Sequence, residues 1–198
     1  MALKDYPKRL TLKDGTAVTV RPMVKEDGDA LYAFFKGLPE EDRLYLRDDV
    51  ADRAVIDRFV REIDYSKVLP LLAFDGEEVI GDATLRRSHF GWKTHVGEIR
   101  LVVARKFQQK GLGSTLAKLL VEHAMSSGLD ILTAEMIENQ IGAAKALGRL
   151  GFKKEAVLKG RVKDIHGTRR NLVLLSNDIS HIWHAMESVY MEYLPSQE

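Results

Sequence analysis

The segment Gln108-Gln109-Lys110-Gly111-Leu112-Gly113 is the part of the sequence whose residue types and spacing most clearly indicate chemistry. Two glycines separated by one residue stand where an apolar, strand-like run gives way to a leucine-rich, helix-like run. Glycine lets the backbone approach a ligand closely, and the first turn of a helix has unpaired N–H groups with partial positive charge. The segment therefore predicts an anion-binding loop, unless the glycines serve only to turn the chain.

Two common phosphate-binding motifs do not fit this loop. A dinucleotide fingerprint needs a third glycine three residues after the second, and Leu116 stands there. A Walker A loop needs Gly-Lys-Ser/Thr five residues after its first glycine, and Gly111 is not followed by these residues. The sequence therefore disfavours NAD binding and nucleoside triphosphate chemistry.

The elements around the loop alternate between strand-like and helix-like periodicity. Strands are expected at Ala17–Arg21, Val68–Asp75, Glu78–Arg86, His95–Val103, Ile131–Met136, Phe152–Arg161 and Asn171–Leu175. Helices are expected from Glu26 to Leu38, at Arg53–Ile63, from Leu112 to a glycine cap at Gly128, at Gln140–Leu150 and at Asn177–Leu194. This order predicts an α+β (α/β) chain with a mixed sheet.

The composition limits what the chain can do. Its 198 residues include 30 Lys and Arg against 29 Asp and Glu, and no cysteine. A net charge of +1 implies neither a nucleic-acid nor a membrane partner, and the lack of cysteine excludes an acyl-cysteine intermediate. No linker or repeat divides the sequence, so we expect one domain at residues 1–176 followed by an amphipathic helix and tail at 177–198. No apolar leader is present, which favours a cytoplasmic protein.

The loop QQKGLG resembles the (Gln/Arg)xxGx(Gly/Ala) loop of the GNAT superfamily of acetyl-CoA-dependent N-acetyltransferases, and the similarity extends over roughly residues 15–176. The resemblance implies the GNAT fold, a mostly antiparallel mixed sheet of about seven strands with helices on both faces. It also implies acetyl-CoA as cosubstrate. The pantetheine arm would pair with the backbone of Leu101, Val102 and Val103. The pyrophosphate would lie on the loop and helix start formed by Gln108, Gln109, Lys110, Gly111, Leu112, Gly113 and Ser114.

Glu98 is the residue that this resemblance implies as the catalytic base, because it stands ten residues before Gln108. A lysine-like amine of pKa 10.4 is neutral in only about 0.04% of molecules at pH 7, so acetylation requires removal of a proton. The alternative is that Glu98 only pairs with Arg100 or Arg86 on an exposed strand face. The acceptor amine is either a small molecule or a protein lysine, since the opening of the sequence also resembles bacterial protein-lysine acetyltransferases.

Two positions depart from the family pattern. The tyrosine that many members use as general acid is replaced by Leu147, so no general acid is assigned. The asparagine that often contacts the cofactor is shifted, so that either Asn139 or Gln140 could take its role. The rival interpretation is therefore a non-catalytic acyl-CoA sensor or scaffold.

Three weaker patterns leave alternatives open. The six histidines have no metal-ligand spacing, and no metal is expected. The polar stretch Arg86–Lys93 carries Phe90 and Trp92, which either form an acceptor-binding lip or cover the sheet edge. The terminal helix either covers the sheet or forms a homodimer interface.

Overall fold

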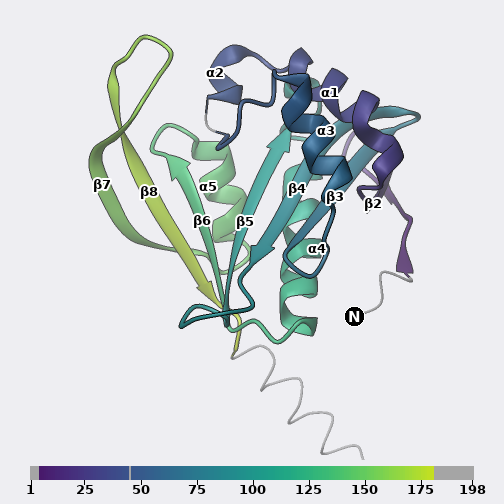
Figure 1. The fold of residues 1–198 in the computed structure, drawn as a ribbon. Helices are drawn as coiled ribbons and strands as arrows, with labels where there is room; N and C mark the ends of the chain where they lie inside the picture. Colours follow the sequence, from purple (N-terminus) through teal and green to yellow (C-terminus); the bar gives the residue numbers. More distant parts are fainter. Residues whose placement is uncertain (1–4, 45, 181–198) are drawn as a thin grey trace, which may run out of the picture.

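An eight-stranded sheet organises residues 5–44 and 46–180, which are the residues that the computed structural model describes (Figure 1). Its strands follow the order β1-β2-β3-β4-β5-β6-β8-β7, and only the β5–β6 pair is parallel within this described part. The strands are β1 Lys8–Thr11, β2 Ala17–Pro22, β3 Val68–Asp75, β4 Glu78–Arg87, β5 Val96–Val103, β6 Ile131–Ile137, β7 Lys153–Lys163 and β8 Arg169–Asp178.

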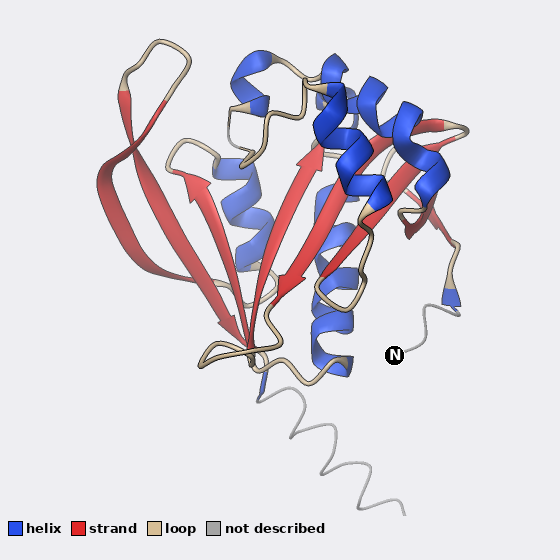
Figure 2. Cartoon of the chain, in the orientation of Figure 1, coloured by secondary structure: helices blue, strands red, loops and turns tan. Residues whose placement is uncertain are grey.

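The helices lie on both faces of the sheet, as expected (Figure 2). They are α1 Gly28–Gly37, α2 Glu40–Arg43, α3 Arg53–Arg61, α4 Leu112–Ser126 and α5 Ile141–Gly148, with 3-10 turns η2 Lys25–Asp27 and η3 Arg105–Phe107. The core on one face joins α4 to Leu71, Ala83 and Ile99 of the sheet. The core on the other face joins α1 and α3 to Leu72 and Phe74. The predicted fold class and mostly antiparallel sheet are confirmed.

The first strand, β1, was not predicted. It has four residues, of which only Leu10 is apolar, and β2 is its one partner among the described strands. A single apolar side chain gives no alternating pattern to detect, so the predicted number of seven strands is one too few.

The helix α4 starts and ends close to its predicted limits. Its predicted apolar stripe is buried throughout, and it consists of Leu112, Leu116, Leu119, Leu120 and Ala124. The helix ends at Ser126, and Gly128 follows with a φ of 73°. This packing fixes the helix N-terminus against the end of β5.

The chain leaves the sheet later than the sequence indicated. Asn177, predicted to begin the terminal helix, instead pairs with Leu132 as part of β8 and donates through its side chain to the Leu150 carbonyl at 2.8 Å. This buried hydrogen bond and the ladder with β6 extend the strand to Asp178. The rest of the predicted helix, from residue 181 on, lies outside the described residues. No helix in the described part is long and apolar enough to cross a membrane.

Candidate functional site

The sheet divides into a fork between β5 and β6. These parallel strands pair only at Val96–Glu98 with Ile131–Thr133, whereas β5 stays paired with β4 as far as Val103 and β6 with β8 as far as Ile137. Beyond Glu98 the facing edges of β5 and β6 therefore diverge, as Figure 1 shows. Unpaired strand edges can accept an extended, amide-containing chain as an added strand. Leu101, Val102 and Val103 lie on this open edge of β5.

A glycine stands at the closed end of the fork. A Cβ built on Gly97 would lie 2.8 Å from Leu129, 2.9 Å from Leu132 and 3.0 Å from Leu85. Such distances are too short for a methyl group unless neighbouring side chains shift. The close packing at Gly97 therefore fixes where β5 and β6 part, and it places Glu98 at that point.

The predicted phosphate loop lies at the open end of the fork. Within the described part of the chain, the backbone N–H groups of residues 109–114 donate no hydrogen bond. Gly111 has a φ of 94° and Gln109 a φ of 62°, both in the left-handed region, and α4 begins at the next residue, Leu112. The Gln108 side chain donates to the Val103 carbonyl at 3.0 Å, which ties the loop to β5. Six consecutive unpaired N–H groups at a helix N-terminus fit a pyrophosphate.

The β1–β2 turn supports this loop from outside. The Lys13 N–H donates to the Lys110 carbonyl at 3.0 Å, and the Lys110 ammonium lies 2.8 Å from an Asp14 carboxylate oxygen. Hydrogen bonding to Lys110 lowers the pKa of Asp14 to about 2. The charge of Lys110 is thus matched by Asp14, which leaves the backbone N–H groups as the unpaired donors of the loop.

Glu98 lies on the sheet face opposite α4, and two arginines hold its carboxylate. Nη2 of Arg47 donates to both oxygens, at 2.8 and 2.9 Å, and Nε of Arg100 donates to Oε1 at 3.0 Å. The pairing with Arg100 is one that the sequence suggested. Arg86 faces Glu98 across the β4–β5 ladder, but no ion pair joins them in the described part.

Arg47 is a site residue that sequence reasoning missed. It lies between α2 and α3, fifty-one residues before Glu98, and no local pattern distinguishes it. The segment that carries it is also attached to the start of the phosphate loop, because Arg105 of η3 binds Asp42 at 3.0 Å and contacts Glu41. Residues of α2 therefore contact the turn before the loop, and Arg47, four residues after α2, contacts the carboxylate of Glu98.

A second carboxyl group, Asp82, lies on the same face. It is opposite Val102 in the β4–β5 ladder, and it accepts a long hydrogen bond of 3.4 Å from Thr84 Oγ1. Burial raises the pKa of Asp82 to about 7. No cation pairs with it among the described residues, in contrast to Glu98. Sequence reasoning did not single out Asp82.

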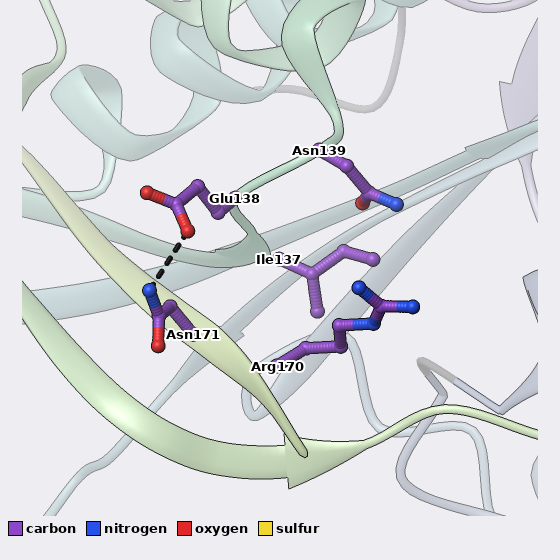
Figure 3. A pocket seen from close by; sticks show the side chains of 5 residues that line it. All are labelled: Ile137, Glu138, Asn139, Arg170 and Asn171. Atoms are coloured by element: carbon purple, nitrogen blue, oxygen red, sulfur yellow. Dashed lines mark hydrogen bonds between the residues drawn. The ribbon is translucent and has the colours of Figure 1, made fainter. Parts of the chain in front are cut away.

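Asn139 and Gln140 differ in what their side chains do. The Gln140 carbonyl oxygen accepts from the Ile137 N–H at 3.2 Å, at the start of α5. Asn139 lines a shallow cavity of about 140 Å³ with Ile137, Glu138, Arg170 and Asn171 (Figure 3). The Asn139 amide and the Arg170 guanidinium lie on one side of this cavity, which adjoins the end of β6 at Ile137. Asn139 is therefore the better placed of the two to meet a ligand.

The position expected for a tyrosine is part of the core. Leu147 is only 4% exposed and packs in the cluster that includes α4. The hydroxyl groups of Tyr6 and Tyr65 are hydrogen-bonded to His123 and to the Met23 carbonyl, away from the fork. Tyr190 and Tyr193 lie outside the described residues. Within the residues that are described, no group of three or more His, Asp or Glu side chains is arranged to hold a metal ion.

Comparison with known proteins gives one family match and many structural matches. The sequence model of the Acetyltransferase (GNAT) family matches residues 31–152. The acetyltransferase of GNAT family from Streptococcus pneumoniae superposes with a TM-score of 0.73 at 20% identity, covering 82% of this chain and 99% of that one. The GNAT domain of S. lividans PAT has a TM-score of 0.71 at 21% identity, covering 87% and 96%. A Salmonella typhimurium structure with its cofactor acetyl-CoA has a TM-score of 0.71 at 18% identity, covering 82% and 94%.

Proposed function

Because the chain belongs to the acetyltransferase (GNAT) family, we propose that this acetyl-CoA-dependent enzyme acetylates a primary amine that binds beside Glu98. The observation that carries the proposal is the position of Glu98, a carboxylate at the closed end of a strand fork whose open end is an anion-binding loop. The first acceptor class to test is a protein lysine, with small amines as the comparison.

The fork and loop fit acetyl-CoA in three places. The open edge of β5 at Leu101, Val102 and Val103 would pair with the amides of the pantetheine arm. The N–H groups of residues 109–114 would bind the pyrophosphate, and Asn139 would contact the cofactor near the end of β6. The bound cosubstrate supplies the acetyl group as a thioester, whose CoA thiolate is a tolerable leaving group because thiol pKa values lie near 8.5.

The chain's own residues would then prepare the amine for direct attack within a ternary complex. Glu98 would take one proton from the ammonium, directly or through a water, so that the nitrogen lone pair can form the new C–N bond as the C–S bond breaks. The second proton that the nitrogen loses would go to the departing CoA thiolate, so that the products are the neutral amide and the CoA thiol. Backbone N–H groups of the open β5 edge would stabilise the negative charge that develops on the carbonyl oxygen. No covalent enzyme intermediate is required.

Arg47 sets a condition on this scheme. Its guanidinium occupies both oxygens of Glu98, so an acceptor ammonium must displace it before the carboxylate can accept a proton. The Arg47 guanidinium and the acceptor ammonium each carry one positive charge, so the exchange leaves the net charge beside Glu98 unchanged. The Arg47 side chain would therefore move when the acceptor binds.

The test is a comparison of wild type and Glu98→Gln with acetyl-CoA and a panel of lysine peptides, polyamines and amino acids. We expect the variant to lose about 10²–10⁴-fold in kcat near neutral pH, with acetyl-CoA affinity measured by calorimetry unchanged. The loss should shrink at high pH, where the amine is already neutral. Glu77→Gln, at the exposed β3–β4 turn, is the matched control. An unchanged rate in Glu98→Gln between pH 6 and 8 would exclude Glu98 as the base.

A further inference from the structure

Arg86 is a cation beside Glu98 whose guanidinium forms no ion pair or hydrogen bond with another described residue. It faces Glu98 directly in the β4–β5 ladder, so both side chains project from the same face of the sheet. Its partner in the β3–β4 ladder is Val68, which carries no charge. Arg86 is also exposed to solvent. Its guanidinium is therefore available to a ligand that binds next to Glu98.

Three guanidinium groups thus stand next to one carboxylate. Arg47 and Arg100 bind Glu98 through Nη2 and Nε, and Arg86 faces it across the ladder. An acceptor ammonium that binds Glu98 would bring a further positive charge to this cluster. Like charges at short range repel one another, and an anionic group on the acceptor would relieve the repulsion. A polyamine, or a lysine among other basic residues, would instead increase it.

Two other carboxylates on this face do not pair with Arg86. Asp82 lies four residues earlier on β4, which at about 3.3 Å per residue is roughly 13 Å along the strand. Glu135 lies on β6 two residues beyond Thr133, the last residue that pairs with β5, and so stands across the open part of the fork. Within the described part of the chain, the positive charge of Arg86 is therefore left without a matching anion.

Arg86 also begins the polar stretch between β4 and β5 whose role the sequence left open. Phe90 and Trp92 of that stretch are 93% and 90% exposed, so they do not cover the sheet edge, and that expectation is wrong. Residues 86–97 contain no acidic side chain. The stretch is therefore positively charged, and Arg86 is the residue through which its charge reaches Glu98.

We propose that Arg86 binds a carboxylate of the acceptor while the acceptor amine lies at Glu98. This inference rests on the proposed function, and it narrows the acceptor to amines that carry a carboxylate nearby. Facing side chains of a ladder are roughly 5 Å apart at Cβ, so about three methylene groups between amine and carboxylate would suit both residues. A small amino acid and a lysine peptide with neighbouring glutamates both offer this chemistry. Arg86 determines specificity and takes no part in the proton transfer.

Matched pairs of acceptors test this assignment with the full-length protein and saturating acetyl-CoA. One pair is γ-aminobutyrate and its uncharged amide, and the other is a lysine peptide flanked by glutamates and the same peptide flanked by glutamines. We expect kcat/KM to be about fivefold higher for the carboxylate member, mainly through a lower KM, which is the size of an exposed ion pair. The preference should decrease at high salt. The pair with the larger ratio identifies a small molecule or a peptide as the source of the carboxylate.

Substitutions of Arg86 show whether this residue causes the preference. Arg86→Gln keeps a polar side chain but removes the charge, so the two members of each pair should react alike. Arg86→Glu should reverse the preference in favour of the uncharged members. Arg9→Gln, at an exposed arginine of the edge strand β1, is the matched control and should keep the wild-type ratio. Equal kcat/KM within each pair in wild type, or an unchanged ratio in Arg86→Gln, would overturn the assignment and leave acetyl transfer at Glu98 intact.

Binding without turnover separates this inference from the proposed function. With CoA in place of acetyl-CoA no acetyl group can be transferred, and calorimetry measures only the affinity of the peptide. We expect the glutamate peptide to bind about fivefold more tightly than the glutamine peptide, and Arg86→Gln to remove the difference. If the glutamate peptide bound in this way but was never acetylated, the proposed function would fail and the assignment of Arg86 would stand. If the two peptides bound equally, the assignment of Arg86 would fail, whatever the rate of acetylation.

Discussion

The two ends of the fork are built in different ways. The phosphate loop uses backbone groups of consecutive residues, Gln108 to Ser114, placed by one helix start and one left-handed glycine. The proposed acceptor side consists of side chains from separate segments: Arg47 from before α3, Asp82 from β4, and Glu98 with Arg100 from β5. A site made from backbone is specified locally, whereas a site made from side chains depends on how distant segments meet.

The largest effect on ligand binding is expected from placing a negative charge in the backbone-built end. Gly113→Asp should weaken acetyl-CoA binding about 100-fold, or roughly 2.7 kcal/mol, because a carboxylate would stand among the N–H groups that we propose bind the phosphate oxygens. Isothermal titration calorimetry with acetyl-CoA measures this loss.

Gly113→Ala is the matched control for that change. A Cβ at this position meets only Val103, at an ordinary 3.8 Å, and the φ of Gly113 is not positive. Acetyl-CoA affinity should therefore stay within a few-fold of wild type. Equal losses in both variants would mean that the loop binds through its shape alone and not through the electrostatics of its N–H groups.

On the proposed acceptor side, we expect Asp82 to have a large effect on how the free energy of unfolding depends on pH. The pKa of the Asp82 carboxyl is about 7 in the folded protein and near 3.8 in the unfolded chain. As the pH rises above 4, this carboxyl therefore ionises in the unfolded chain before it ionises in the folded protein. The group therefore lowers the free energy of unfolding as pH rises from 4 to 7. Asp82→Asn should remove this decrease in the free energy of unfolding. The free energy of unfolding of the variant relative to wild type should therefore rise by about 2–4 kcal/mol between pH 4 and pH 7.

Urea unfolding of both proteins at several pH values checks this result. Glu77→Gln, exposed on the β3–β4 turn, should follow the wild-type pH profile. If the free energies of unfolding of Asp82→Asn and wild type differed by a constant amount from pH 4 to 8, the Asp82 carboxyl would have the same pKa in the folded and unfolded states, contrary to this prediction.

The same contrast explains what could be predicted from the sequence. The phosphate loop, α4 and the β3–β4 hairpin follow from contiguous patterns of glycine, leucine and a tight Asp-Gly turn, and each was placed to within a few residues. β1 was missed because it has one apolar residue, and the continuation of β8 through Asn177 depends on the distant Leu150 carbonyl. Arg47 pairs with Glu98 from fifty-one residues away in the sequence, so its role has no local signal.

A smaller effect is expected from the cation that occupies Glu98. Exposed ion pairs typically contribute up to about 1 kcal/mol, so Arg47→Ala should lower the KM for the amine about fivefold, while kcat changes less. The reason is that the acceptor no longer has to displace a guanidinium. Steady-state kinetics at saturating acetyl-CoA give both constants.

Arg61→Ala, which breaks an exposed pair with Glu62 on α3, is the control and should leave KM unchanged. A fall in kcat at constant KM in Arg47→Ala would reverse the interpretation. Arg47 would then be a positioning residue that holds the base in place, and the acceptor side would be preformed like the phosphate loop.

The smallest effect concerns the one cationic side chain of the phosphate loop. Asp14→Asn would release Lys110 from its carboxylate partner, and acetyl-CoA affinity should then rise about two- to threefold at low salt and less at high salt. Because the pKa of Asp14 lies at about 2, the carboxylate is charged throughout pH 5–8 and the gain should be constant over that range. Adding Lys110→Gln should abolish the gain. If Lys110→Gln alone weakened binding as much as Gly113→Asp, the ammonium rather than the backbone would hold the phosphate, and the two ends of the fork would both be built from side chains.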